Sequence, residues 1–264
     1  MFEKVNPCHP DKIADRIAGA LVDRAYEIKD DPKIAVEVLI GHNQCTIISE
    51  ANVRFRENEV NEIIKRISGQ TPELKLIQIN QDIHLSENQK TLSCGDNGIF
   101  KGVPISEEEK YLINLAGELY SKYPFDGKYL IDNQKVTICQ SHADNINLSD
   151  TDKSFVINPL GYWTGGIDVD SGATNRKLGS DLGRGVTGGG IHGKDLSKAD
   201  VTLNLYCFLK AQATGTPVEL SCSIGDKTVN GFEYQYYVNF VKRYIKSIGG
   251  FEKLAEWGLL RPEN

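Results

Sequence analysis

Residues 33–79 decide the fold of the N-terminal part of the chain, and they begin with the runs KIAVEVLI (33–40) and QCTIISE (44–50). Apolar and polar side chains alternate through both runs, and a turn-prone triplet separates them, which together predict an antiparallel hairpin. A helix is expected over 57–68 and a further strand at LKLIQI (74–79). The order strand, strand, helix, strand predicts an α+β arrangement, in which helices cover one face of a mixed sheet.

Further helices and strands are predicted on both sides of this segment. Pro10 suits the first turn of a helix over 10–28, whose apolar side chains recur every fourth residue. Ser106 and Glu109 form a capping-box sequence that predicts the start of another helix. The run 199–213 has the pattern of a helix, although its alternation also fits a strand. Strands are further expected at 135–140, 154–158, 218–225 and 232–238, and helical segments near 239–257.

The bulk composition excludes several classes of protein. The chain has 264 residues, of which 40% are hydrophobic and 25% charged, as in ordinary globular proteins. A net charge of −6 argues against a general nucleic-acid binder. No apolar run approaches the length of a membrane span and no signal-peptide core is visible, so we expect no membrane association and a cytoplasmic location. The six cysteines form no C-x-x-C pair and mostly lie in apolar runs, which predicts buried free thiols and no zinc site.

The first concentration of chemistry is Cys8-His9-Pro10-Asp11-Lys12, at the start of the first predicted helix. Backbone N–H groups at a helix start favour an anion such as phosphate. His9 and Lys12 could donate to that anion, while Asp11 could hold a magnesium ion that bridges its oxygens. Taken alone, the segment is better explained as a capped helix with solvated charges.

Three further stretches combine glycines with charged side chains. Gly95–Gly98 most often makes a plain turn. The adjacent arginine and lysine that end Asp170–Lys177 suit phosphate binding, although a solvated loop explains them about as well. Gly188–Asp195 nearly matches a P-loop, but Asp195 replaces the hydroxyl residue that would bind magnesium, and no strand precedes it. Together the four stretches predict a magnesium–polyphosphate site without a nucleophile–base pair.

In this order the stretches resemble the signatures of S-adenosylmethionine synthetases. His9–Asp15 is similar to GHPDKIAD, Gly95–Gly98 to the GDQG core, and Ile157–Lys177 to the run INPTG…GG…D-x-G-L-T-G-R-K. Gly188–Asp200 is similar to GGGAFSGKDPSKVD. The resemblance implies an α+β fold of three similar β/α units, with mixed sheets and helices on one face. The implied units are an N-terminal one at 1–93, a shortened central one at 94–164 and a C-terminal one at 165–264.

The resemblance also implies a role for each matching residue. The side chains around the triphosphate and the reacting centre correspond to His9, Lys135, Arg176, Lys177 and Lys194. The family's magnesium ligands, for two ions per site, correspond to Asp11 and Asp200, and its potassium-binding carboxylate corresponds to Glu37. The residues that bind ATP and methionine correspond to Glu50, Gln89, Asp96, Trp163, Asp170, Lys198 and Ile224, with Trp163 placed on the adenine ring.

The sequence departs from the family pattern at two positions of the site. Cys8 replaces the glycine that precedes the histidine. The family's central lysine precedes its strand as K-x-Q-V-T, whereas Lys135 stands directly before Val136-Thr137, displaced by two positions. Because side chains in a strand repeat every two residues, Lys135 could still face the same site. A helical insertion of the family is reduced here to residues 143–153.

The implied function is that of a methionine adenosyltransferase, which converts ATP, L-methionine and water into S-adenosylmethionine, phosphate and diphosphate. Methionine sulfur attacks C5′ of ATP in line and needs no general base. The family implies Mg²⁺, K⁺ and a homodimer with shared active sites. One alternative is a catalytically impaired homologue that binds ATP or methionine, or acts as a regulatory subunit; His9, Asp11, Lys194 and Asp200 are all retained, which weighs against it. The other is a polyphosphate or ATP hydrolase, for which Glu50 and Gln89 would have no role.

Overall fold

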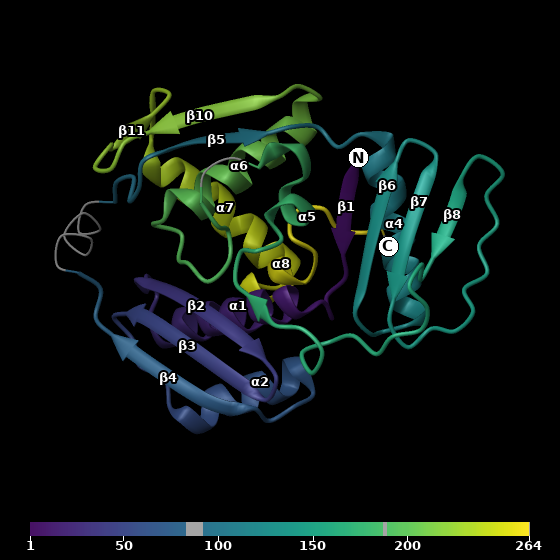
Figure 1. Ribbon diagram of the computed structural model, residues 1–264. Coiled ribbons are helices and arrows are strands. Elements are labelled where there is room, and N and C mark those ends of the chain that lie inside the picture. Colours follow the sequence, from purple (N-terminus) through teal and green to yellow (C-terminus); the bar gives the residue numbers. More distant parts are fainter. Residues whose placement is uncertain (83–91, 187–188, 264) are drawn as a thin grey trace.

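The computed structural model describes residues 1–82, 92–186 and 189–263. Its three main sheets surround a central group of helices (Figure 1). Two of these sheets have four strands each and mix parallel with antiparallel pairs, and the third has two strands. The predicted α+β class with mixed sheets is therefore confirmed. The division into units at 1–93, 94–164 and 165–264 stays a prediction.

The first sheet is the one predicted from residues 33–79. β2 (Ile34–Gly41) pairs antiparallel with β3 (Gln44–Ala51), and β3 pairs parallel with β4 (Glu73–Ile79) after helix α2 (Glu57–Ser68). Alternate side chains of β2 and β3 are buried in the core, while those between them are half-buried or exposed. The sheet therefore has one covered face and one open face, as a period of two requires.

Helix α1 (Pro10–Ile28) lies between this sheet and the C-terminal helices. It packs closely on α8 (Phe251–Trp257), because a Cβ atom on Gly19 would lie 2.7 Å from the carbonyl oxygen of Phe251. The carboxylate of Asp23 accepts hydrogen bonds from the first two backbone N–H groups of α8, at 2.8 and 2.9 Å. These contacts fix the direction of α1, and with it the position of its N-terminus.

The second sheet has the order β1-β6-β7-β8. β6 (Gly127–Asp132) and β7 (Lys135–Gln140) form a hairpin, β1 (Phe2–Val5) pairs antiparallel with β6, and β8 (Ser154–Ile157) pairs parallel with β7. Helix α4 (Glu107–Lys122) packs on β1 and β6. Since β1 leads directly into α1, the second sheet and the first share the segment that carries His9.

The third sheet pairs β5 (Gly98–Gly102) with β10 (Val218–Cys222) over helix α6 (Ala199–Thr214). The helical interpretation of 199–213 is confirmed, because residues all around the first three turns are buried and alternation toward one face plays no part. β10 ends three residues short of the predicted 225, where the backbone N–H of Asp226 donates to Ser223 in a turn.

The strand predicted over 232–238 is wrong beyond its first two residues. β12 (Phe232–Glu233) pairs with β11 (Thr228–Val229), and helix α7 (Tyr234–Ile248) begins directly afterwards. The tyrosines in FEYQYYV alternate over a short stretch, but the buried side chains continue at helical spacing through Tyr237, Val241 and Ile245. A pattern read over seven residues was too short to separate the two periods.

A short strand and a short helix complete the frame of the site. Gly172–Ala173 forms the short strand β9, which adds to the edge of β2 and is followed by helix α5 (Leu178–Leu182). In the ranges that the structure covers, no helix is both long enough and apolar enough to span a membrane.

Candidate active site

His9 is the N-cap residue of α1, and its ring is buried. Its Nδ1 accepts a hydrogen bond from the backbone N–H of Asp11 (3.2 Å), so the ring proton is assigned to Nε2. Burial lowers the pKa of His9 to about 4, with Lys177 and Lys128 adding to the effect of burial and Asp11 opposing it. At neutral pH the residue is therefore an uncharged imidazole that can donate through Nε2.

Asp11 stands in the first turn of α1 and is also buried. One carboxylate oxygen accepts from the backbone N–H of Ala173 (2.9 Å) and lies 3.7 Å from Nη1 of Arg176, and the other lies 3.4 Å from Nζ of Lys177. Gly172 permits this approach, because a Cβ atom there would lie 1.9 Å from the carbonyl oxygen of Pro10. Asp11 and Ala173 are 162 residues apart in the chain, and the fold brings the charges of the two motifs together.

A second ion pair lies at the start of α6. Nζ of Lys194 is 2.6 Å from Oδ2 of Asp200, and both side chains are largely buried. Lys194 bridges to Ala35 of β2, whose partner on the other side is Glu50 of β3. Ala35 therefore lies between Lys194 and Glu50, and the predicted methionine-binding carboxylate belongs to the same strip of the sheet.

Three residues of the glycine-rich stretch and the segment after it lie around this ion pair. The Lys198 backbone forms the N-cap of α6. Gly189 approaches Asp200 so closely that a Cβ atom would lie 2.1 Å from the Asp200 Cγ. Asp195, counted among the carboxylates of the glycine-rich stretch, accepts instead from the backbone N–H groups of Ile34 and Ser197, both at 2.8 Å. The Asp195 carboxylate thus stabilises the loop and is not free for a metal.

Lys12 does not point to an anion at the helix N-terminus, contrary to the sequence expectation. It is fully buried, and its Nζ lies 2.6 Å from Asp181, 3.1 Å from Asp15 and 3.3 Å from Nε2 of His192. Burial alone would lower the pKa of Lys12, but Asp181 and Asp15 outweigh it and raise that pKa. Asp15, Asp181 and His192 also gather their ligand atoms within 4.8 Å, as a metal site would. The Lys12 ammonium supplies the positive charge among them.

The central segment contributes two residues that were not singled out from the sequence. Asp126 is buried and accepts from the backbone N–H of Gly166 (2.9 Å); burial raises its pKa to about 6, and Asp170 and Asp11 add to the rise. Lys128 lies in β6 opposite Val5, and its ammonium group pairs with Glu3 at 2.8 Å. The Lys128 charge acts to lower the pKa of both His9 and Asp126. The available signal was the triplet Asp126-Gly127-Lys128, which combines carboxylate, glycine and cation as the other motifs do.

Lys135 lies elsewhere on the same hairpin. It is exposed, begins β7 and pairs with Asp132 beside the turn, whereas the other end of the hairpin pairs Gly127 with Gln140. That end is the one bonded to Asn6, next to the start of α1. Five strand steps separate Lys135 from it, or roughly 16 Å. The structure therefore does not bring Lys135 together with His9.

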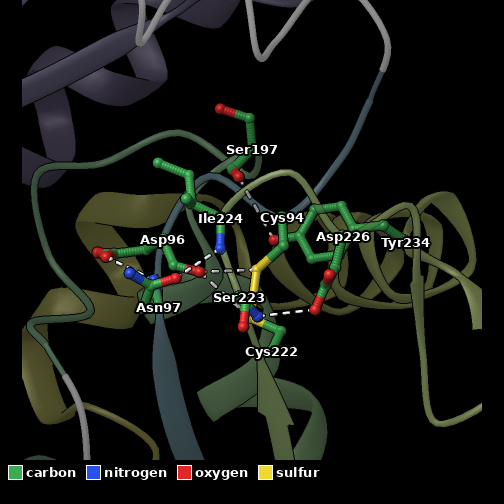
Figure 2. The surroundings of a disulfide bond; sticks show 9 residues. All are labelled: Cys94, Asp96, Asn97, Ser197, Cys222, Ser223, Ile224, Asp226 and Tyr234. Atoms are coloured by element: carbon green, nitrogen blue, oxygen red, sulfur yellow. Dashed lines mark hydrogen bonds between the residues drawn. A yellow bond between two sulfur atoms is a disulfide. The ribbon is translucent and has the colours of Figure 1, made fainter.

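The loops around Asp96 and Ile224 lie side by side (Figure 2). The backbone N–H of Ile224 donates to Oδ1 of Asn97 (2.6 Å), and a Cβ atom on Gly95 would lie 3.0 Å from the Ser197 carbonyl oxygen, at the approach to α6. Asp96 is half-buried, and half of the Ile224 surface is exposed. These two predicted residues therefore border the Lys194–Asp200 end of the site.

Cys94 and Cys222 form a disulfide between these loops, with Cα atoms 6.8 Å apart (Figure 2). The expectation that all six cysteines are free thiols is therefore wrong for this pair. The sequence could not show it, because the partners are 128 residues apart and lie in no recognisable spacing. Cys45 and Cys207 are buried free thiols as expected, and Cys8 and Cys139 are half-buried free thiols.

The other predicted residues have the following places. Glu37 is exposed on the open face of β2 and accepts from Oγ1 of Thr174, which precedes Arg176 by two residues. Asp170 is exposed and Trp163 half-buried, in the loop that leads from β8 to β9. Gln89 lies outside the described residues. The structure thus groups His9, Asp11, Arg176 and Lys177 directly, with the Lys194 pair and Glu37 on adjoining segments.

Part of the sequence and the fold of the chain are similar to those of known proteins. Residues 1–90 match the family model described as S-adenosylmethionine synthetase, N-terminal domain. The S-adenosylmethionine synthases of Oenococcus oeni and Borreliella afzelii are 27% and 26% identical to the chain, over 84% and 75% of it and 76% and 68% of their own lengths. A solved structure titled as an unusual S-adenosylmethionine synthetase from Campylobacter jejuni shares the fold, with a TM-score of 0.73 at 19% identity over 98% of this chain and 94% of its own. The N-terminal third of the chain therefore matches the S-adenosylmethionine synthetase family, and the chain has the fold of a solved S-adenosylmethionine synthetase.

Proposed function

We propose that the protein is a methionine adenosyltransferase, which forms S-adenosylmethionine from ATP and L-methionine and releases the triphosphate as phosphate and diphosphate. The observation that carries the proposal is the grouping of His9, Asp11, Arg176 and Lys177 at the N-terminus of α1. Three donors with their hydrogens available to a ligand, two of them cations, suit the triphosphate leaving group.

The chemistry requires stabilisation of charge on the leaving group more than proton transfer. Methionine sulfur is nucleophilic without a base, whereas the departing triphosphate gains negative charge as the bond to C5′ breaks. A neutral His9 can donate from Nε2 to that group without the cost of burying a second charge beside Lys177. Each preorganised donor of this kind contributes about 3 kcal/mol to a transition state.

The two carboxylates predicted to bind magnesium fit that ion. Asp11 and Asp200 are almost fully buried, and each already faces a lysine, Lys177 or Lys194 respectively. Carboxylate oxygens are the ligands that Mg²⁺ takes in proteins, and it also binds phosphate oxygens. A magnesium triphosphate would therefore exchange partners with these ion pairs, with carboxylates to the metal and lysines to the phosphates. The magnesium would neutralise the phosphate oxygens; a potassium ion at Glu37 belongs to the same proposal.

The substrate-binding residues are proposed on the same basis. Trp163 would carry the adenine ring, and Glu50, Gln89, Asp96, Asp170, Lys198 and Ile224 would surround ATP and methionine. For the lysine of the central segment we propose Lys128, because it lies close enough to His9 to influence its pKa. Lys135 stands at the far end of the hairpin.

A homodimer with shared active sites is part of the proposal. The open face of the first sheet exposes apolar side chains that a monomer would leave in water, namely Leu39 (53% exposed), Ile48 (39%) and Ile79 (45%). Glu37 and Glu50 belong to that same face. A second copy seated on it would bury the apolar side chains and complete the site between subunits. A cytoplasmic location is proposed from the family.

The test is product formation by the purified protein with ATP, methionine, Mg²⁺ and K⁺, with all three products followed by chromatography. Equal amounts of S-adenosylmethionine, phosphate and diphosphate are expected, and Asp11→Asn should lower kcat/KM by about 10²- to 10³-fold. Glu27→Gln is the matched control, because it removes a carboxylate charge from the same helix at an exposed position. A folded dimer that binds ATP and makes no S-adenosylmethionine would instead identify a catalytically impaired homologue.

A further inference from the structure

We propose that His192 is a positioning residue, which fixes Lys194 relative to Arg176 and Lys177 through the buried charge cluster of Lys12, Asp15 and Asp181. The inference rests on the proposed triphosphate site. It explains how Lys194, on one side of that site, is held at a fixed position relative to Arg176 and Lys177 on the other side. None of the four clustered side chains lies at the surface, since each is at most 2% exposed. They therefore act on a ligand only through the segments that they join.

The cluster joins three segments that the chain separates widely. Lys12 and Asp15 come from α1, Asp181 from α5, and His192 from the glycine-rich stretch before Lys194. Nε2 of His192 lies 2.9 Å from Oδ2 of Asp181, 3.3 Å from Nζ of Lys12 and 3.6 Å from Oδ2 of Asp15. Because the Asp181 carboxylate can only accept, Nε2–H of His192 donates to it. Nζ of Lys12 donates to the carboxylates of both Asp181 and Asp15.

The charges of the cluster support one another. Burial alone would raise the pKa of Asp181, but Lys12, His192 and Lys4 outweigh burial and hold that pKa far below its usual range. Asp181 is therefore ionised at every pH at which the protein would work. A charged acceptor makes the hydrogen bond from His192 stronger than a neutral pair would be.

The backbone of His192 is tied to the other phosphate-binding loop. Its N–H donates to Oδ1 of Asn175 (3.0 Å), and Nδ2 of Asn175 donates back to its carbonyl oxygen (3.2 Å). The backbone N–H of Asn175 in turn donates to Oδ1 of Asp15 (2.8 Å). Asn175 directly precedes Arg176, so His192 is bonded on one side to the cluster and on the other to the loop of the two cations.

The step from His192 to Lys194 is short and also fixed. Gly193, between them, has a left-handed backbone (φ 77°), and its carbonyl oxygen accepts from the N–H of Val36 in β2 (2.7 Å). Lys194 then extends to Asp200. Glycines at 189, 190 and 193 make this stretch intrinsically flexible, and a flexible chain does not hold an ammonium group within the fraction of an ångström that phosphate binding requires. His192 and the bonds beside it supply that restraint.

The experiment compares three variants with the full-length wild type. His192→Leu removes the ring nitrogens and retains bulk, while His192→Gln restores a donor near the place of Nε2. Leu119→Ala is the control for lost stability, because it removes a buried apolar side chain from α4, which carries none of the cluster residues. The measurements are the calorimetric affinity for inorganic tripolyphosphate with Mg²⁺, the separate KM values for ATP and methionine, and the melting temperature.

We expect His192→Leu to weaken tripolyphosphate binding by about tenfold or more and to raise KM for ATP, with KM for methionine changed less than about twofold. His192→Gln should recover most of the affinity. Leu119→Ala should lower the melting temperature without changing tripolyphosphate binding. If His192→Leu does not fold, Asn175→Gly, which keeps the left-handed backbone and removes the amide, should show the same separation of the two KM values.

A folded His192→Leu protein with the tripolyphosphate affinity of the wild type would overturn the inference. So would equal losses for ATP and methionine, because these would indicate general destabilisation. The binding measurement keeps this inference separate from the proposed function. A wild type that binds tripolyphosphate but makes no S-adenosylmethionine would contradict the proposed function and leave the role of His192 open to the same comparison of variants.

Discussion

The pair of Lys12 and Asp181 offers a direct measure of what the buried cluster contributes to stability. Asp181→Asn keeps the shape of the side chain and removes its charge, leaving Lys12 with Asp15 as its one carboxylate within the cluster. At a separation of 2.6 Å, two unit charges attract by about 6 kcal/mol at an effective dielectric constant of 20. Asp181→Asn also removes the free-energy cost of burying the Asp181 charge, which offsets about half of the lost attraction. We therefore expect the free energy of unfolding to fall by about 3 kcal/mol, as when other buried pairs are broken.

Urea unfolding at pH 7, followed by tryptophan fluorescence at a fixed protein concentration, measures that loss. The double variant Lys12→Met/Asp181→Asn should lose less than the sum of the two single variants, because neither partner is then left buried alone. The pH dependence has a definite sign. Asp181 has a lowered pKa in the folded protein, so its stabilisation is present above about pH 4 and lost as the pH falls below that value. A single-variant loss below about 1 kcal/mol at pH 7, or simple additivity in the double variant, would refute this account.

Three further predictions concern other parts of the molecule. Burial lowers the pKa of Lys4 to about 7, so above that pH the folded protein binds fewer protons than the unfolded chain. Urea unfolding should therefore show a free energy of unfolding that rises from pH 7 to pH 9, and Lys4→Met should abolish the rise. Leu39→Asp or Ile48→Asp should raise the dissociation constant of the proposed dimer by more than about tenfold in sedimentation experiments. A variant that stays dimeric would exclude the open sheet face as the interface. Reduction of the Cys94–Cys222 bond, which spans 128 residues, should lower the free energy of unfolding by up to about 5 kcal/mol; identical melting curves with and without reductant would contradict this.

The sequence predicted the elements whose patterns are long and clearly bounded. Helix α1 begins at Pro10, α2 spans 57–68, and the capping box of Ser106 and Glu109 forms as expected, because these signals act locally. The failures lie where a short pattern competes with tertiary packing. Residues 234–238 alternate like a strand, yet their continuation packs as the helix α7 on the core.

The candidate site was predictable as a list of charges and less so as an arrangement. Asp11 with Arg176 and Lys177 could be expected to meet, because anions and cations near a helix N-terminus attract one another. The direction of Lys12 could not be read from its neighbours in sequence. It depends on Asp181, 169 residues away, and on His192, whose neighbours in the chain suggested only a flexible loop.

The close packing of α1 on α8 has a consequence for synthesis. The helix that presents His9 and Asp11 leaves the ribosome early. The Asp23 carboxylate and the backbone at Gly19 can contact α8 only after the segment at Phe251 has been synthesised. Contacts between such distant segments form late and slowly in folding. A nascent chain, or one cut before α8, would therefore carry the proposed triphosphate-binding residues without the support that orients them. Binding of triphosphate at the proposed site is therefore expected only after translation has passed this point.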